Sequence, residues 1–371
     1  MENQFTTAAA PKTVKNPEPV INEARLLDFV HKAVGEVGAA MSAALVVIGD
    51  KLGLYRALAQ SGPLTSAELA RLTGTAERYV REWLANQASG GFLTYDAATQ
   101  KFTLPPEQAY CLADEASPFN LQGAFAIVEA VFHAQERGVE NFRTGAGLEW
   151  GHQHSCLFSG TERFFRAAYI GNLVGSWLPA LEGVKEKLER GATVADVGCG
   201  FGASTILMAQ AFPKSTFVGF DYHEGSVKAA RERAAKAGLS DRVRFETARS
   251  TDFSGKGYDL VCTFDCLHDM EDPAGAARHI KTTLGKEGTW MIVEPLAGDK
   301  VEQNLNPVSR VYYAASTLIC VPHSLSAAGP ALGAQAGEER LRDVIVKQGG
   351  FSRMRRATET PFNMVLEARL G

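Results

Sequence analysis

A glycine-rich stretch, VADVGCGFGAST at residues 194–205, constrains the fold of this chain more than any other segment. The apolar residues that open it are typical of a buried strand, and STILMAQAF, which follows, is typical of a helix. Gly198, Gly200 and Gly202 allow the backbone to approach a ligand closely, beside the free amides of a helix N-terminus. A strand, a glycine turn and a helix in this order predict a nucleoside-binding corner of an α/β sheet.

The C-terminal half of the chain repeats this alternation. Short apolar strands are predicted at residues 193–197, 216–221, 243–247, 258–264 and 289–295, with helices at 204–212, 224–238 and 273–285. Strands joined by helices favour a parallel, doubly wound sheet. A last helix at residues 337–351 and two further strands, FSRMRRAT and FNMVLEARL, bring the expected number of strands to seven.

Two types of cofactor fit the glycine run taken alone. Gly198, Gly200 and Ala203 satisfy the looser dinucleotide pattern, G-x-G-x-x-G/A. Asp196 favours a cofactor with a methionine moiety over a dinucleotide. An acid before the glycines repels a pyrophosphate but can pair with the amino group of a methionine. Asp221, at the end of the second predicted strand, can accept hydrogen bonds from both ribose hydroxyls, which either cofactor carries.

The run resembles the first motif of class I S-adenosyl-L-methionine (SAM)-dependent methyltransferases, an acid followed by G-x-G-x-G. The final helix and two strands resemble the end of the methyltransferase sheet, a seven-stranded Rossmann-like sheet whose last strand inserts antiparallel. In many relatives an acid after the third strand contacts adenine; this chain offers the amides of Arg249 and Ser250 instead. The resemblance implies SAM as cofactor, with these binding residues: Asp196, Gly198, Cys199, Gly200, Gly202, Asp221, Tyr222, Arg249, Ser250, Phe264 and Asp265.

A histidine follows the fourth predicted strand, in the stretch FDCLHDMEDP. Ligands of open α/β sheets bind outside the carboxyl ends of the strands, so we expect His268 to face the site. LHDMEDP resembles the LHDW-D stretch of winged-helix O-methyltransferases, with Met270 in place of the usual Trp. That resemblance implies His268 as the general base for the acceptor hydroxyl and Glu294 as the acid that orients it. A strand-end or capping role for His268 is the plainer alternative, and the acids after it suit a helix N-terminus.

The N-terminal part predicts a winged helix. Two helices within residues 65–89 precede two short strands around DAATQ, and Thr65 with Glu68 forms a capping-box pattern. DNA binding is disfavoured, because Glu77 and Glu82 offset Arg78 and Arg81 on the second helix. We expect a dimerisation or substrate-capping module instead. With DVGCGFGAST, FDCLHDMEDP and ETPFN, the whole chain resembles a bacterial group of winged-helix methyltransferases of largely undefined substrate.

Two further segments offer candidate acceptor-binding residues. The helical stretch 116–190 is rich in aromatic residues and contains GLEWGHQHSC, whose His152, His154 and Cys156 suggest pocket or surface residues more than metal ligands. No fourth ligand suggests itself nearby, so no metal site is predicted. An inserted helix is expected between residues 297 and 337. The predicted substrate residues are His152, His154, Tyr312, Tyr313 and His323, with Cys320 as a further lining candidate and packing as the alternative role for each.

Bulk properties restrict the class of protein. The net charge of −4 gives no attraction to nucleic acid or an anionic membrane. The longest apolar runs are far shorter than the ~20 residues of a membrane span. Six scattered cysteines without a CxxC pair suit reduced thiols in a cytosol. We expect a flexible tail at residues 1–20, a winged-helix domain at 21–115, a helical linker and lid at 116–190 and a SAM-binding domain at 191–371.

The sequence therefore predicts a cytoplasmic, homodimeric SAM-dependent methyltransferase that acts on a hydroxyl, thiol or amine of a small molecule. Two alternatives stay open: a SAM-sensing winged-helix transcription regulator and a NAD-dependent oxidoreductase. Neither the acceptor, nor the methylated atom, nor the pathway follows from the residues.

Overall fold

Seven strands form one mixed sheet, in the order β5-β4-β3-β6-β7-β9-β8. They are β3 (Thr193–Val197), β4 (Thr216–Asp221), β5 (Val243–Thr247), β6 (Tyr258–Phe264), β7 (Leu284–Pro295), β8 (Arg353–Glu359) and β9 (Asn363–Arg369). The first five are parallel, and β9 lies antiparallel between β7 and β8. The predicted seven-stranded sheet with an antiparallel last strand is confirmed. The strand order reverses between β3 and β6, which is the place where such sheets bind ligands.

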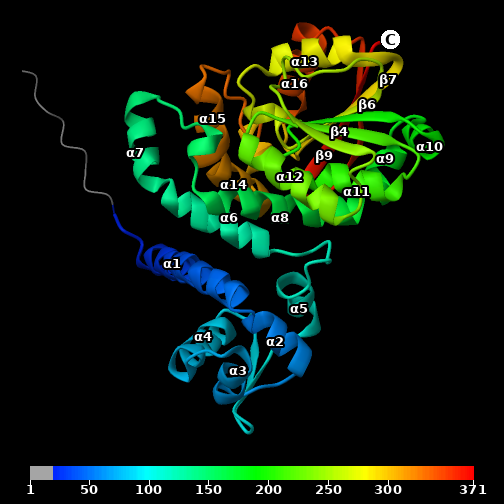
Figure 1. Cartoon of the computed structure of the whole chain (residues 1–371). Coiled ribbons are helices and arrows are strands. Elements are labelled where there is room, and N and C mark those ends of the chain that lie inside the picture. Colours follow the sequence, from blue (N-terminus) through cyan, green and yellow to red (C-terminus); the bar gives the residue numbers. More distant parts are fainter. Residues whose placement is uncertain (1–19) are drawn as a thin grey trace, which may run out of the picture. The chain divides into compact units, whose positions relative to one another are not determined.

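Helices cover both faces of this sheet in the computed structural model, which describes residues 20–371 (Figure 1). The helices are α10 (Val184–Arg190), α11 (Ala203–Ala211), α12 (Glu224–Lys236), α13 (Pro273–Thr283) and α16 (Gly337–Arg342), which continues into the π-helical turn η6 (Asp343–Gln348). Successive residues of a strand point to opposite faces, so Leu260 and Cys262 join the core under α11 and α12, whereas Val261 joins the core under α13 and α16. The tail predicted at residues 1–20 lies, except for Val20, outside the described residues.

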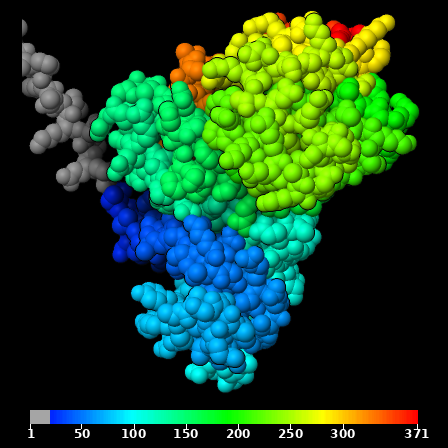
Figure 2. All heavy atoms as spheres, viewed as in Figure 1, coloured from blue at the N-terminus to red at the C-terminus, as the bar shows by residue number. Residues whose placement is uncertain are grey.

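The winged-helix module consists of α2 (Leu54–Ser61), α3 (Ser66–Thr73), α4 (Glu77–Ser89) and the hairpin β1 (Thr94–Asp96) with β2 (Lys101–Thr103), followed by α5 (Pro106–Leu112). Its residues run from blue to cyan in Figure 2. The capping box of Thr65 and Glu68 is present, and Gly74 ends α3 in the left-handed conformation. These local signals explain where α3 begins and ends.

Contacts divide the chain into one unit that ends at Ser42 and another from Ala43 to Gly371, and α1 (Glu23–Lys51) crosses this boundary. By length and composition α1 is apolar enough to cross a membrane. Its apolar residues are spread over many turns and polar residues interrupt them, so no single apolar run in this helix reaches the length of a membrane span, in agreement with the sequence analysis. Its exposed apolar side chains include Leu26, Leu27, Val30, Val34, Val37 and Met41.

A helical region connects the winged helix to the sheet. It comprises α6 (Gln122–His133), α7 (Gln135–Thr144), η1 (Trp150–His152), α8 (Ser155–Asn172), the π-helical turn η2 (Leu173–Trp177) and α9 (Leu178–Ala180). Helices α6 and α8 pack closely because glycines face the partner backbone. A Cβ added at Gly123 would lie 2.3 Å from the backbone nitrogen of Phe164. Near the C-terminus, α14 (Pro307–Ala315), the π-helical turn η5 (Ser316–Cys320) and α15 (Val321–Ser326) form the inserted segment.

Candidate active site

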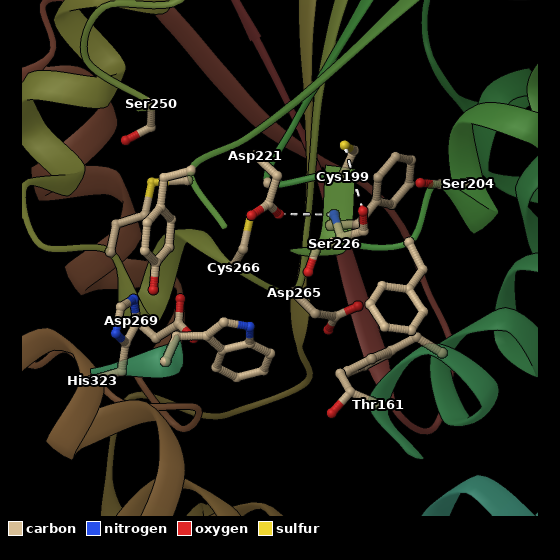
Figure 3. Close-up of a pocket in the computed structure, with 18 of the residues that line it drawn as sticks. Thr161, Cys199, Ser204, Asp221, Ser226, Ser250, Asp265, Cys266, Asp269 and His323 are labelled. Carbon is tan, nitrogen blue, oxygen red and sulfur yellow. Dashed lines mark hydrogen bonds between the residues drawn. The ribbon is translucent and has the colours of Figure 1, made fainter. Parts of the chain in front are cut away.

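A cavity of about 390 Å³ lies at the carboxyl ends of β3, β4 and β6, where the strand order reverses (Figure 3). Helix α8 closes one side of it, and α15 contributes His323. Nine of the eleven residues predicted to bind the cofactor line it: Gly198, Cys199, Gly200, Asp221, Tyr222, Arg249, Ser250, Phe264 and Asp265. Asp196 and Gly202 do not line it.

The glycine corner between β3 and α11 has the conformation that its sequence predicts. The φ angles of Gly198, Gly200 and Gly202 are +77°, +52° and +77°, a region that glycine adopts at little cost. A Cβ on Gly200 would meet no atom within 4 Å, so this glycine leaves open space beside the cavity. A Cβ on Gly202 would lie 2.6 Å from the ring of Phe245, so this glycine permits close packing of α11 on the sheet.

Asp196 is buried against the start of α11. Its Oδ2 atom accepts hydrogen bonds from the hydroxyls of Ser204 and Thr205, both at 2.6 Å, and its Oδ1 atom has no protein partner. Burial raises the pKa of Asp196 to about 6, although the two hydroxyls act in the opposite direction. The carboxylate thus fixes the helix to the strand end. The predicted contact with the amino group of a methionine stays a prediction, for which only Oδ1 remains.

Asp221 at the end of β4 holds two loops at the rim of the cavity. Its Oδ2 atom accepts a hydrogen bond from the Gly200 amide at 2.9 Å (Figure 3), and Oδ1 accepts one from the His223 amide at 2.9 Å. Burial raises the pKa of this carboxyl group, and the two amides partly offset the effect. Each oxygen keeps a second lone pair, so the side chain can still accept hydrogen bonds from a ribose.

The two residues predicted to be catalytic lie in contact. His268 is in the short helix η3 (Leu267–Asp269), directly after β6, and Glu294 is near the end of the adjacent strand β7. The Nδ1 atom of His268 lies 2.6 Å from Oε2 of Glu294, whose Oε1 accepts a hydrogen bond from the Leu267 amide at 2.9 Å. Burial lowers the pKa of His268, but the negative charge of Glu294, followed by the interaction with Cys320, raises it well above the usual value.

The other nitrogen of His268 faces the inserted segment and not open space. Its Nε2 atom lies 3.4 Å from Sγ of Cys320 in η5. His268 is only 4% exposed and does not line the cavity, whereas the next residue, Asp269, does. An acceptor hydroxyl must therefore take the place of the Cys320 thiol to reach Nε2.

The predicted substrate residues separate into three groups. His323 lines the cavity and stacks on Tyr222, with ring centroids 5.7 Å apart. The Tyr312 hydroxyl donates a hydrogen bond to the carbonyl oxygen of Phe362 at 3.1 Å, and Tyr312 and Tyr313 lie outside the cavity lining. His152 and His154 line a second hollow of about 430 Å³ together with His133. Their role in acceptor binding stays a prediction.

Several lining residues did not emerge from the sequence motifs. Their helical spacing could have identified them. In a helix such as α8, residues three, four, seven and eleven positions after a given residue lie on the same face. That face of the helix contributes Phe158, Thr161, Glu162, Phe165 and Tyr169 to the cavity. The sequence predicted only that the whole segment 116–190 is a helical linker and lid. Cys266 and Asp269, which adjoin His268 after β6, are further lining residues.

Comparisons with sequence families match two parts of the chain. Residues 188–341 match a family described as "Methyltransferase domain", and residues 40–114 match an "Rv2258c-like winged HTH domain". The first region holds the glycine corner, Asp221, His268 and Glu294. The second holds the helices and hairpin that were predicted to form a winged helix.

Curated relatives match short parts of the chain. The ubiquinone biosynthesis O-methyltransferase of Dinoroseobacter shibae is 32% identical over 120 residues, which are 32% of this chain and 44% of that protein. The 27-O-demethylrifamycin SV methyltransferase of Amycolatopsis mediterranei is 36% identical over 87 residues, 23% of this chain and 32% of that protein. The chain thus spans less than half the length of either of these relatives.

Solved structures match over almost the whole chain. The mitomycin 7-O-methyltransferase MmcR has a TM-score of 0.68 at 21% identity, and the match covers 94% of this chain and 100% of that one. Human N-acetylserotonin methyltransferase, in a complex with SAM, has a TM-score of 0.68 at 15% identity, with 96% and 100% covered. At these identities the likeness establishes the shared fold.

Proposed function

Because residues 188–341 form a methyltransferase domain and residues 40–114 a winged helix-turn-helix domain, we propose that this protein is a SAM-dependent methyltransferase that acts on a hydroxyl oxygen of a small molecule. One observation carries the choice of a hydroxyl: the buried His268–Glu294 pair lies at the same sheet edge as the glycine corner. A hydroxyl must lose a proton when it is methylated, and a carboxylate-oriented imidazole can accept it.

The residues of the cavity fit SAM. The glycine corner provides backbone amides, and Asp221 offers acceptors to a ribose. The cavity wall carries the carboxyl groups of Asp265 and Asp269, which favour a cationic ligand. When bound, SAM supplies an electrophilic methyl group on a sulfonium. The solved structure of N-acetylserotonin methyltransferase, which shares this fold, holds SAM and supports the choice.

The protein's own contribution to the reaction is alignment and proton transfer. Methyl transfer is an in-line displacement, so holding the acceptor oxygen in line with the sulfonium lowers the barrier by removing translational and rotational freedom. Glu294 accepts a hydrogen bond from Nδ1–H of His268, which leaves the Nε2 lone pair of the neutral ring to accept the hydroxyl proton. A general base of this kind contributes ~10²–10⁴-fold to the rate. A thiol or amine acceptor that reacts without a base would leave His268 a positioning role.

The two alternative functions have less support. A DNA-reading helix needs free cations, but on α4 Arg78 pairs with Glu82 at 2.6 Å and Arg81 pairs with Glu77 at 2.8 Å. A dinucleotide fold would continue as a second mononucleotide half, whereas here the antiparallel strand β9 follows. Salt-dependent duplex binding would support the regulator, and NADH binding would support the oxidoreductase.

The exposed apolar face of α1 supports a homodimer. Val34, Val37 and Met41 are all more than half exposed, and a second copy of the chain would remove such side chains from water. Light scattering after size exclusion tests this: Val34→Glu should give monomers, whereas Tyr79→Glu, at an exposed position on α4, should not. A dimer that survives Val34→Glu, or protein that floats with lipid vesicles, contradicts this arrangement.

A cytoplasmic location is part of the same proposal. All six cysteines are free. Cys199 and Cys266 line the cavity, and Cys262 lies in the core beside the sheet. A reducing compartment keeps such thiols reduced. Fractionation of cells followed by immunodetection tests the location, and recovery in the membrane fraction would contradict it.

Calorimetry and an acceptor screen test the main proposal. We expect S-adenosylhomocysteine to bind to the purified protein and NADH not to bind. Release of S-adenosylhomocysteine from SAM, measured across hydroxyl, thiol and amine compounds, then identifies the acceptor class. Tight binding of NADH without binding of S-adenosylhomocysteine would overturn the assignment.

A further inference from the structure

Three side chains that can ligate a metal meet at the wall of the cavity. His268 and Asp269 follow β6, and Cys320 ends η5, fifty-two positions after His268. One ligand atom from each of the three lies within 4.8 Å of the others. We propose that His268, Asp269 and Cys320 form a binding site for a divalent zinc ion beside the SAM cavity, whose wall includes Asp269.

The spacing of the nitrogen and sulfur atoms fits tetrahedral zinc. Zinc binds sulfur at roughly 2.3 Å and histidine nitrogen at roughly 2.0 Å, which places two tetrahedral ligands roughly 3.5 Å apart. The Nε2 atom of His268 and Sγ of Cys320 are 3.4 Å apart. The carboxylate of Asp269 needs to move by roughly 1 Å to complete three protein ligands, which leaves the fourth position open.

A carboxylate already holds the other ring nitrogen of the histidine. Metal-bound histidines commonly donate their other ring proton to a carboxylate, which fixes the tautomer and strengthens the ligand. Glu294 takes this position, at 2.6 Å from Nδ1, and is itself held by the Leu267 amide. The Nε2 lone pair is therefore directed at Cys320, where zinc would replace the thiol proton.

The charge of the region also favours a cation. Asp265, Asp269 and Glu294 gather around the site. Within residues 20–371, Glu294 pairs with His268, and no lysine or arginine is recorded in a salt bridge with any of the three. A zinc ion bound by one thiolate and one carboxylate would be neutral together with its ligands, which reduces the cost of burying these charges. Asp269 lines the cavity and provides a path by which the ion can enter (Figure 3).

Cobalt titration of the full chain, after dialysis against EDTA, tests the site. We expect one Co²⁺ per chain, with a thiolate-to-cobalt charge-transfer band and the intense visible bands of tetrahedral cobalt. Zn²⁺ should displace the cobalt and remove both signals. Cys320→Ser should abolish the charge-transfer band, and Glu294→Gln should weaken metal affinity ~10–100-fold while leaving the band in place.

A second histidine–cysteine pair offers a matched control. There Nδ1 of His154 lies 2.9 Å from Sγ of Cys156, and within residues 20–371 no carboxylate is recorded as hydrogen-bonded to the His154 ring. Cys156→Ser should leave the cobalt spectrum unchanged. A band that disappears in Cys156→Ser but persists in Cys320→Ser overturns the proposal, as does the absence of any thiolate–cobalt band in folded protein. Circular dichroism identifies variants that fail to fold, and Cys320→Ala serves as the second variant at that position.

Metal and acceptor compete for one lone pair, and this consequence rests on the proposed function. With zinc on Nε2, His268 cannot accept a proton, so Zn²⁺ should inhibit methylation of a hydroxyl acceptor and EDTA should restore it. The spectroscopic result does not depend on turnover. If the protein binds cobalt at this site but has no methyltransferase activity, the proposed function is refuted and the metal site stands. If it has methyltransferase activity but gives no thiolate–cobalt band, only the metal site is refuted.

Discussion

The Nδ1 atom of His268 lies 2.6 Å from Oε2 of Glu294, and the two residues are 4% and 1% exposed. Adjacent parallel strands produce this pair, because β6 delivers His268 and β7 delivers Glu294 to the same edge of the sheet. A buried carboxylate beside an imidazole fixes both the orientation and the protonation of the ring.

Removal of the imidazole should slow the reaction without loss of cofactor binding. For His268→Ala we expect turnover with a hydroxyl acceptor to fall ~10²-fold or more, because the proton acceptor is lost. The dissociation constant of S-adenosylhomocysteine should stay the same, since His268 does not line the cavity. Turnover assays and calorimetry on the same preparation provide the comparison. Unchanged turnover would remove the base assignment.

The Glu294 carboxylate should set the pH dependence of the reaction. Burial lowers the pKa of His268, yet Glu294 raises it more, so the net pKa is above the usual value. Only the neutral ring accepts a proton, so kcat/KM should rise as the pH passes upward through this raised pKa. Glu294→Gln removes the opposing charge, and the rise should move to lower pH. A rise that moves to higher pH, or stays in place, contradicts this role.

The same pair links stability to pH. The folded state holds the His268 proton more tightly than the unfolded chain does. The stabilisation is therefore fully present below the usual histidine pKa and is lost as the pH rises through the raised one. The pH dependence of urea unfolding in wild type and Glu294→Gln measures it, and identical profiles for the two would contradict the coupling.

Asp221 should account for a large share of cofactor affinity. Asp221→Asn keeps the shape but loses charge-assisted hydrogen bonds, so S-adenosylhomocysteine should bind ~10–100-fold more weakly. Asp241→Asn, at an exposed position before β5, is the matched control and should bind normally. Calorimetry at constant salt measures both variants. Equal affinities would show that the ribose is held elsewhere.

Two glycines of the same corner should respond differently to alanine. Gly202→Ala places a methyl group 2.6 Å from the Phe245 ring, at a residue whose φ is +77°. We expect the free energy of unfolding to fall by at least ~1–3 kcal/mol. Gly200→Ala meets no protein atom but lies on the cavity wall, so it should reduce cofactor affinity more than stability. Urea unfolding and calorimetry of both variants test this contrast. A reversed order of effects would contradict the packing assignment.

Local signals in the sequence predicted much of the fold and of the cofactor side of the site. Thr65 and Glu68 specify the start of α3, and glycines with positive φ specify the corner after β3. Asp221 and His268 were found because each follows a predicted strand, and the carboxyl ends of parallel strands must meet at one edge. Period and spacing carry this information, so tertiary contacts were not needed to find it.

Local patterns do not show which neighbour a polar side chain will choose. Thr75 illustrates this: a threonine directly after the Gly74 stop is of the type that caps the next helix, but α4 begins after Ala76, and the Thr75 hydroxyl bonds to that of Thr73. Asp196 likewise binds the hydroxyls of Ser204 and Thr205, which the turn after β3 brings back to it. The hydrogen-bond partner of such a side chain depends on donor–acceptor distances, and small backbone rotations change these distances.

The sequence by itself determined the order of strands and helices, the glycine corner and the residues at the strand ends, since each depends on spacing within a short segment. Only the tertiary structure placed Cys320 against His268 and sent His152 and His154 to a different hollow. Those positions depend on how separate segments pack on the sheet. Side-chain volume and burial across the whole chain set that packing, and no short pattern encodes it.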